Sequence, residues 1–304
     1  MHRAHHLYQV IIALSVIVSS CGQLGIADFD LGPDPSTAVG PYKRVAIIES
    51  PHGLEFDWVS AAPCPNESLL IIGGTSNGET TWLASIRDAD EAARWETFTQ
   101  SVSGLEDAAI HCTESSIFVF GVGQTTEGSR LGYLWELTLE NGEPTTRSEH
   151  SYPVAQSANS PSLRVDRDHI DTLYWDPEDA NDMKLVGKRF QRSTLTEQSE
   201  VEFVTTINEA QQDVSLRLMT TRERQYLPIL TGYGRLEGSD ETWIQKGDDG
   251  TPEPLETGER YTSQTLIRWK NAFWIIGTRL RPSVPLGLVL STESDRIPTL
   301  QEVF

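Results

Sequence analysis

The sequence predicts an all-β protein, a β-propeller of five four-stranded blades that follows a signal peptide and a short linker. Two observations lead to this architecture. Short apolar strand candidates recur along the 304 residues, and a two-strand unit repeats at intervals of about 45–56 residues. The composition agrees, because 38% hydrophobic residues are too many for wholesale disorder and 23 glycines are too few for collagen.

The repeat is clearest in two segments, Ala61–Gly73 and Ala109–Gly121, which align at a constant offset. Both contain an alanine, a cysteine, a serine, a four-residue apolar run and a closing glycine. Similar strand pairs begin at Ser162, Ser215 and Thr265. Each unit therefore reads as a strand, a short polar turn and an apolar strand, as expected for propeller blades.

Two further strand candidates follow each pair, and the last of them is Gln301–Phe304. The apolar segment Lys43–Glu49 is left over. It either closes the ring by joining a terminal blade or belongs to a degenerate sixth blade. The main rival architecture is a pair of β-sandwich domains, whose strands would alternate without a fixed period near fifty residues.

The N-terminus predicts export. A weakly basic start and a nine-residue apolar run precede small residues, as in a secretory signal peptide. We therefore divide the chain into a signal peptide (1–20), a flexible tether rich in Gly, Pro and Asp (21–42) and a propeller domain (43–304).

The residues Val18-Ser-Ser-Cys21 resemble a bacterial lipobox. The resemblance implies cleavage before Cys21 and attachment of lipid to that cysteine. Because Gly22 follows, the acidic signal for inner-membrane retention is absent, which favours the outer membrane or cell surface. Ordinary secretion with a free thiol is the alternative.

The segments Asp88–Trp95 and Glu293–Leu300 resemble the Asp-box of sialidase-like propellers. Both lack the glycine of that motif, and neither begins with serine. The Asp-box is a structural turn in which an Asp side chain accepts backbone N–H bonds, so the resemblance implies a fold and not an activity.

No catalytic residue can be assigned, because the sequence has no nucleophile elbow, zinc-protease motif or phosphate loop. Arg164 and Arg217 occupy the same place in two Ser-Leu-Arg segments. They could face the central channel and hold an anion there, or each could lie at the surface or pair with an acid. The scattered histidines predict no metal site, and no cofactor is expected.

Cys64 and Cys112 occupy equivalent places in the repeat, and an exported protein can form a disulfide between them. The opposing argument is that equivalent points on neighbouring blades could be too far apart. The eight tryptophans lie mostly in apolar strands, so packing between blades is favoured over a carbohydrate platform.

The formal net charge of −20 disfavours binding to nucleic acid. The leading functional prediction is a lipid-anchored binding or scaffolding module of the cell envelope. Its expected partners are the membrane, through the anchor, and an unknown envelope protein or glycan. The alternative is a sialidase-like glycoside hydrolase, which would need an arginine cluster, a Tyr–Glu pair and an acid in the channel. A propeller enzyme with a metal in the channel is a third possibility.

Overall fold

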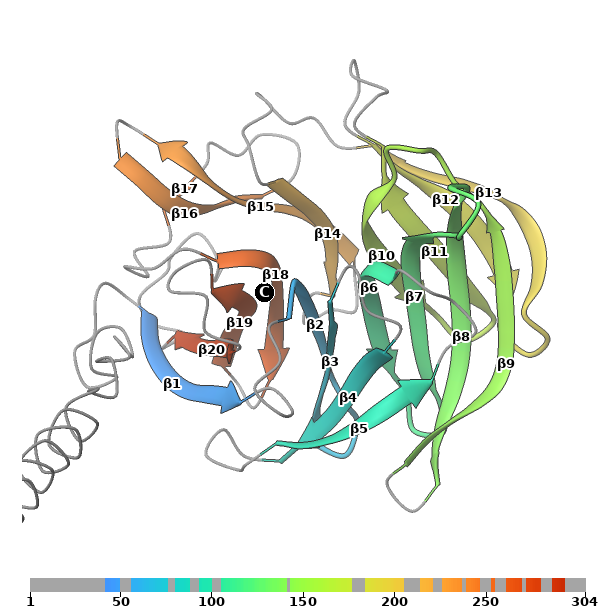
Figure 1. The fold of residues 1–304 in the computed structure, drawn as a ribbon, viewed down its shortest axis with the longest axis horizontal. Coiled ribbons are helices and arrows are strands. Elements are labelled where there is room, and N and C mark those ends of the chain that lie inside the picture. Colours follow the sequence, from blue (N-terminus) through green and yellow to red (C-terminus); the bar gives the residue numbers. More distant parts are fainter. Residues whose placement is uncertain are drawn as a thin grey trace, which may run out of the picture. The chain divides into compact units, whose positions relative to one another are not determined.

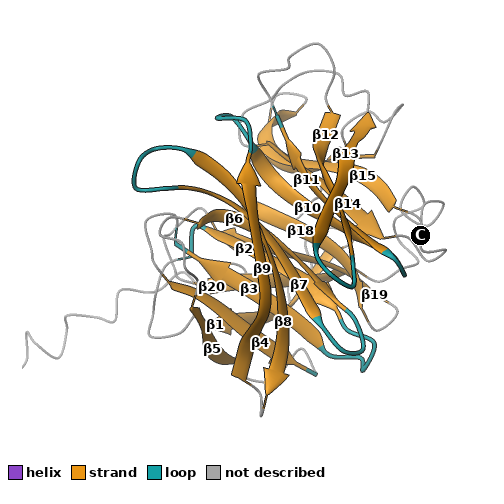
Figure 2. Ribbon diagram, turned by 90° about the vertical axis from the view of Figure 1, so that its right-hand side faces the viewer, coloured by secondary structure: helices purple, strands orange, loops and turns teal. Residues whose placement is uncertain are grey.

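The computed structural model describes residues 42–49, 56–75, 80–87, 93–99, 105–140, 143–176, 184–204, 214–220, 226–236, 239–246, 253–254, 261–269, 272–279 and 286–292. These residues form twenty strands in five antiparallel sheets of four strands each, all within one compact unit, Pro35–Phe304. Strands joined by turns and loops make up the described part (Figure 2), and no helix in that part is long and apolar enough to span a membrane. The predicted five-bladed, all-β fold is confirmed.

The strands of the first three blades follow the order of the chain. Blade one contains β2 (Trp58–Pro63), β3 (Leu69–Gly74), β4 (Thr80–Ile86) and β5 (Arg94–Thr99). Blade two contains β6 (Leu105–Cys112), β7 (Ile117–Gln124), β8 (Arg130–Glu140) and β9 (Glu143–Pro153). Blade three contains β10 (Asn159–Val165), β11 (His169–Trp175), β12 (Lys184–Gln191) and β13 (Thr196–Val204).

Blade four also follows the order of the chain, whereas blade five takes its outer strand from the beginning of the propeller. Blade four contains β14 (Val214–Thr220), β15 (Tyr226–Leu236), β16 (Ser239–Lys246) and the short β17 (Glu253–Pro254). Blade five contains β18 (Tyr261–Trp269), β19 (Ala272–Arg279) and β20 (Leu286–Thr292), and its fourth strand is β1 (Tyr42–Glu49).

The N-terminal strand β1 closes the ring. It pairs antiparallel with β20, from Tyr42 opposite Thr292 to Glu49 opposite Leu286. The leftover segment Lys43–Glu49 therefore joins the terminal blade, and five sheets account for all of the described strands. The predicted strand Gln301–Phe304 lies outside the described residues, and β1 takes the fourth position that this strand was expected to fill.

The first strand of each blade lies innermost, and these five strands contact one another in sequence (Figure 1). Strand β2 contacts β6, β6 contacts β10, β10 contacts β14, β14 contacts β18, and β18 contacts β2. Because the sequence of contacts returns to β2, the innermost strands form a closed ring.

Apolar side chains fill the spaces between blades. Alternate residues of a strand point to opposite faces of its sheet, so a blade can contribute side chains to the interfaces on both of its sides. Trp58, Leu70 and Trp135 pack between blades one and two, whereas Phe120 and Leu163 pack between blades two and three. Ile71 of blade one packs with Ile267 and Trp269 of blade five.

The described tryptophans mostly belong to this core, as expected. Trp58, Trp135, Trp175 and Trp269 are buried, and Trp82 and Trp95 are partly buried. The side chains of Trp243 and Trp274 lie outside the described part.

The two ends of the innermost strands define two faces of the ring, and a hydrogen bond between neighbouring blades lies at each face. At the start face, where the innermost strands begin, the Trp58 indole N–H donates to the Leu105 carbonyl oxygen at 3.2 Å. At the end face, where these strands finish, the Trp269 indole N–H donates to the Glu67 carbonyl oxygen at 2.7 Å. Each bond joins two neighbouring blades.

Candidate functional site

Acidic residues stand where the innermost strands of blades one and two begin. Asp57 immediately precedes β2 and is exposed, and its amide donates to the Gly74 carbonyl oxygen at 2.9 Å. Glu106 and Asp107 lie at the beginning of β6 and are partly buried. Because β2 and β6 are neighbours in the ring, the start face brings acids from two blades to the same region.

A buried arginine organises this region. The side chain of Arg130, only 9% exposed, donates from Nη2 to Glu106 Oε2 at 2.7 Å and from Nε to the Ala158 carbonyl oxygen at 2.7 Å. A buried cation requires such partners, because an unpaired charge in a desolvated place is costly. Arg130 therefore links the beginning of β6 in blade two to the segment that leads into β10 of blade three.

Local chain geometry places Arg130 at this point. The turn before β8 is closed by a bond from the Thr125 amide to the Ser129 carbonyl oxygen. Gly128 adopts a φ of 83° in this turn, a conformation that glycine takes without steric cost. Strand β8 begins at the next residue after Ser129, so its first side chain lies at the start face.

Asp107 sits at an irregularity of β6. The pairing of β6 with β7 shifts register between Leu105 and Asp107, and Asp107 Oδ1 accepts the Ala108 amide at 2.8 Å. Such bulges reorient individual side chains at the edges of sheets and beside functional sites. The irregularity therefore fixes the Asp107 carboxylate against its own backbone.

Blade three contributes serine and asparagine side chains and one acid, Asp176, to the start face. Ser157 Oγ donates to Asp176 Oδ1, and Asn159 begins β10. The next residue, Ser160, is buried with a φ of 47°, and the β10–β11 register shifts between Asn159 and Ser162. The Asn159 Oδ1 atom is buried and has no hydrogen-bond partner in the described part of the chain.

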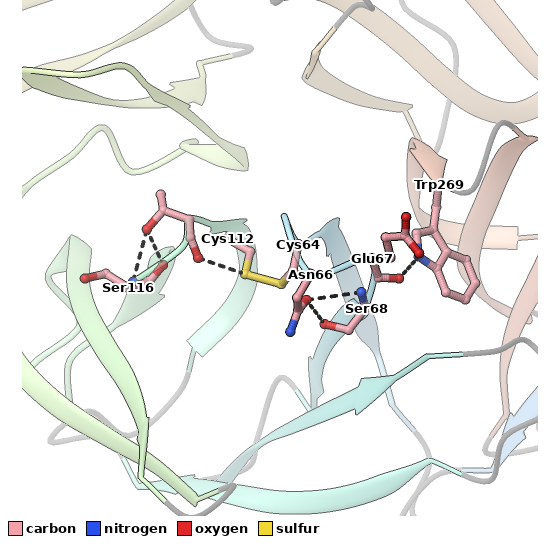
Figure 3. The surroundings of a disulfide bond; sticks show 8 residues. Cys64, Asn66, Glu67, Ser68, Cys112, Ser116 and Trp269 are labelled. Carbon is pink, nitrogen blue, oxygen red and sulfur yellow. Dashed lines mark hydrogen bonds between the residues drawn. A yellow bond between two sulfur atoms is a disulfide. The ribbon is translucent and has the colours of Figure 1, made fainter.

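The end face carries the disulfide. Cys64 follows β2 and Cys112 ends β6, and the structure joins them across blades one and two with a Cα–Cα distance of 5.0 Å (Figure 3). The adjacent turns close in parallel ways, since the Cys64 amide donates to the Ser68 carbonyl and the Thr113 amide to the Ser116 carbonyl. These equivalent turns bring the two cysteines within bonding distance.

A groove of about 640 Å³ lies beside the disulfide, between blades one and two. Hydroxyl groups and an amide line much of it, but these groups largely satisfy one another. Asn66 Oδ1 accepts from the Ser68 amide at 3.2 Å and from Ser68 Oγ at 2.7 Å (Figure 3). Thr113 Oγ1 accepts from the Ser116 amide at 3.0 Å.

The structure pairs Arg164 with a buried acid. Arg164, Asp171 and Arg189 lie opposite one another on β10, β11 and β12, and Asp171 is only 2% exposed. Arg164 Nη2 donates to Asp171 Oδ2, and Arg189 Nε and Nη2 donate to Oδ1 and Oδ2 at 2.7 and 2.9 Å. The hydrogen bond to Asp171 raises the pKa of Arg189. This matches the alternative in which Arg164 pairs with an acid.

The second arginine of the predicted anion site is placed only by its backbone. Arg217 lies on β14 opposite Ile229, and its side chain is outside the described part. A shared anion site for Arg164 and Arg217 therefore stays a prediction. Cys21 and the motif residues Asp88 and Glu293–Leu300 also lie outside the described residues.

A partly buried histidine lies in blade two, away from the acids. Burial, and to a smaller extent the positive charge of Arg192, lower the pKa of His111 to about 4. The Arg192 guanidinium lies 5.6 Å from the centre of the Phe118 ring. His111 is opposite Phe118 in the β6–β7 pair, so the neutral imidazole sits in a largely apolar environment.

Comparisons with known proteins identify the fold and not a family. No family model matches the chain, and no curated protein matches it. Among solved structures, an endo-arabinase from Bacteroides thetaiotaomicron aligns with a TM-score of 0.55 and 9% identity, covering 82% of this chain and 97% of that one. An α-L-arabinofuranosidase from Lactobacillus brevis aligns with a TM-score of 0.51 and 8% identity, covering 80% and 92%.

A thermostable family-43 glycoside hydrolase is also similar, with a TM-score of 0.50 and 9% identity over 80% of this chain and 91% of that one. The chain thus shares its five-bladed propeller fold with family-43 glycoside hydrolases. At such low identities the likeness establishes the fold alone.

Sequence reasoning missed the cluster at the start face. Glu106, Arg130 and Ala158 come from three separate segments, and no spacing rule connects them. A usable signal was present, since acids stand at the beginning of two predicted innermost strands. The predicted repeat could have been used to align these positions.

Proposed function

We propose that the chain is a glycoside hydrolase whose reaction takes place at the start face. The observation that carries the proposal is the placement of acidic residues at the beginnings of two neighbouring innermost strands, β2 and β6. Most glycoside hydrolases use a pair of carboxyl groups that flank the scissile bond, one as a proton donor and one as a base or nucleophile. Asp57, from blade one, and Asp107, from blade two, are the pair that we assign.

Glu106 has a different role in this proposal. Its carboxylate is bound to Arg130 within blade two, and Arg130 in turn bonds to a carbonyl of blade three, so Glu106 already has a structural partner. Asp57 is exposed and Asp107 is partly exposed, so a substrate at the start face can reach them.

The proposed substrates are polysaccharides that contain arabinose. The support for this class is the shared fold with an endo-arabinase and an α-L-arabinofuranosidase. The proposal keeps the hydrolase alternative reached from the sequence but replaces sialosides with neutral sugars. It also removes the need for an arginine cluster, because a neutral sugar carries no carboxylate to be bound.

The decisive experiment measures release of reducing sugar from arabinan and arabinoxylan by the full chain and its variants. Asp57→Asn and Asp107→Asn should each lower kcat by about 10²–10⁴-fold, because each removes a proton-transferring or nucleophilic group. Glu114→Gln, an exposed acid on the end face, is the matched control and should keep the full rate. An inert wild-type chain, or undiminished rates in both Asp variants, would refute the proposal.

A glycan-binding module without hydrolysis is the second candidate. It is favoured by Asn159, a polar residue of blade three at the start face, and by the ion pair that already occupies Glu106 with Arg130. In this case the wild-type chain would bind arabinan and release no sugar. The same assay, combined with a binding measurement, separates the two candidates.

A further inference from the structure

We infer that Asn159 is a sugar-binding residue, whose side-chain oxygen accepts a hydrogen bond from a substrate hydroxyl group. The inference rests on the proposed function, because it names a subsite of the same start face. It goes beyond that proposal by assigning blade three a role in recognition, separate from the two aspartates that carry the chemistry.

Asn159 lies beside the organised part of the start face. The carbonyl of the preceding residue, Ala158, accepts the 2.7 Å bond from Arg130, and Arg130 also holds Glu106. Asn159 is thus one residue away from an anchored point and close to the beginning of β6. A ligand that reaches the acids of blade two therefore lies near this residue.

The side-chain oxygen of Asn159 is buried without a hydrogen-bond donor among the described residues. A buried acceptor without a partner costs about 1–3 kcal/mol, and nearly all such groups in proteins find a partner. Asn159 Oδ1 is buried and unpartnered in the described part of the chain. The residue as a whole is partly exposed, so its side chain borders the surface of the start face.

The backbone beside Asn159 is in an unfavourable conformation. Ser160 is buried and adopts a φ of 47°, a conformation that is unfavourable for residues other than glycine. It lies within the register shift between Asn159 and Ser162, and not in a hairpin turn. Bulges are over-represented beside active sites, where they redirect individual side chains, so the irregularity is consistent with a binding role for Asn159.

The surroundings define the chemistry of the ligand group. An acceptor oxygen requires a donor, and the nearby carboxylates disfavour an anion. The Arg130 cation already balances Glu106. A neutral sugar hydroxyl meets these conditions, since it donates to Oδ1 without adding charge.

The test compares two asparagines by the same substitution. Asn159→Leu removes the unpartnered oxygen at nearly constant volume. Asn66→Leu is the matched control, because Asn66 Oδ1 accepts two bonds from Ser68 on the opposite face. Both variants of the full chain are assayed by thermal unfolding and by calorimetric titration with arabinotriose.

Asn159→Leu should weaken arabinotriose binding about tenfold, as expected for loss of one hydrogen bond, while its Tm stays the same or rises by about 2–4 °C. Asn66→Leu should do the opposite, with unchanged affinity and a lower Tm. If Asn159→Leu does not fold, Asn159→Ala is judged on the same two measurements.

Other outcomes separate the two proposals. If wild type binds arabinotriose and Asn159→Leu binds it equally well, the inference fails and the proposed function stands. A Tm for Asn159→Leu that falls as far as that of Asn66→Leu also overturns the inference, because the oxygen would then have a structural partner such as a water. If wild type hydrolyses arabinan but binds arabinotriose at no measurable affinity, the sugar subsite alone is refuted. If it neither binds nor hydrolyses, the proposed function falls and the subsite with it.

Discussion

Individual polar side chains connect neighbouring blades at both faces of the ring. The Trp58 and Trp269 indoles and the Arg130 guanidinium each donate to a backbone carbonyl of another blade. Backbone carbonyls at strand ends lack ladder partners, so these side chains satisfy groups that would otherwise need water. Blade-to-blade adhesion therefore combines apolar packing with a few directional bonds.

His111 should make stability depend on pH. Its folded pKa of about 4 lies below the ordinary value of 6.5, because burial disfavours the charged form. The unfolded chain therefore binds the proton first, and stability is full above about pH 6.5 and falls as the pH drops towards 4. Protonation of His111 lowers the free energy of unfolding by up to about 3 kcal/mol across that window, and there is no further loss below it.

Urea unfolding of wild type and His111→Gln at pH 7.5, 5.5 and 4 measures this effect. The difference in unfolding free energy between the two proteins should shift in favour of the variant as the pH falls. Carboxylates that titrate in the same range cancel in the comparison. A constant difference between wild type and variant would show that His111 is not buried as a neutral group.

At the scale of strands, the repeat predicted the inner half of each blade well. The expected pair in Ala61–Gly73 corresponds to the end of β2 and to β3, and the pair in Ala109–Gly121 to the end of β6 and to β7. Outer strands were less predictable. Thr145–Tyr152 lengthens to Glu143–Pro153, whereas the strand expected at 201–207 begins at Thr196. Outer strands are more polar, so their apolar periodicity is weaker.

At the same scale, the disulfide joins the ends of two innermost strands, β2 and β6. Replacing Cys64 and Cys112 together with serine opens a loop of 48 residues in sequence and should lower the free energy of unfolding by about 2–4 kcal/mol. Chemical denaturation of the oxidised wild type and the double variant measures the change. Reducing agent should bring wild type to the stability of the variant and leave the variant unaffected. Equal stability of all four samples would mean that the bond does not form.

At the scale of the whole molecule, the fold could be predicted and the site could not. A repeat can be recognised from the sequence, because each blade has the same local pattern of residues. The start-face cluster arises only when separate blades are brought together, as the bonds of Arg130 to Glu106 and Ala158 illustrate. The pairing of Arg164 with Asp171 likewise depends on cross-strand register, which the Ser-Leu-Arg motif does not reveal.

The proposed lipid anchor concerns where the whole molecule acts. Lipid on Cys21 would hold the propeller at a membrane, near polysaccharides of the cell surface or its surroundings. Cys21→Ser should move the protein from the membrane fraction to the soluble exported fraction, while the purified variant should match wild type in the proposed activity on arabinan. Fractionation followed by immunoblotting measures the distribution. Retention of the variant in the membrane fraction would exclude the anchor.

The closure of blade five by β1 affects the order in which the protein can be assembled. Strand β1 is among the first segments to be synthesised, but its partner β20 is among the last. Until residue 292 has been made, β1 has no native neighbour, and β20 then arrives with an unpaired edge of its own. If the chain is exported before it folds, as its N-terminal sequence predicts, this arrangement would keep the ring from closing around an incomplete set of blades.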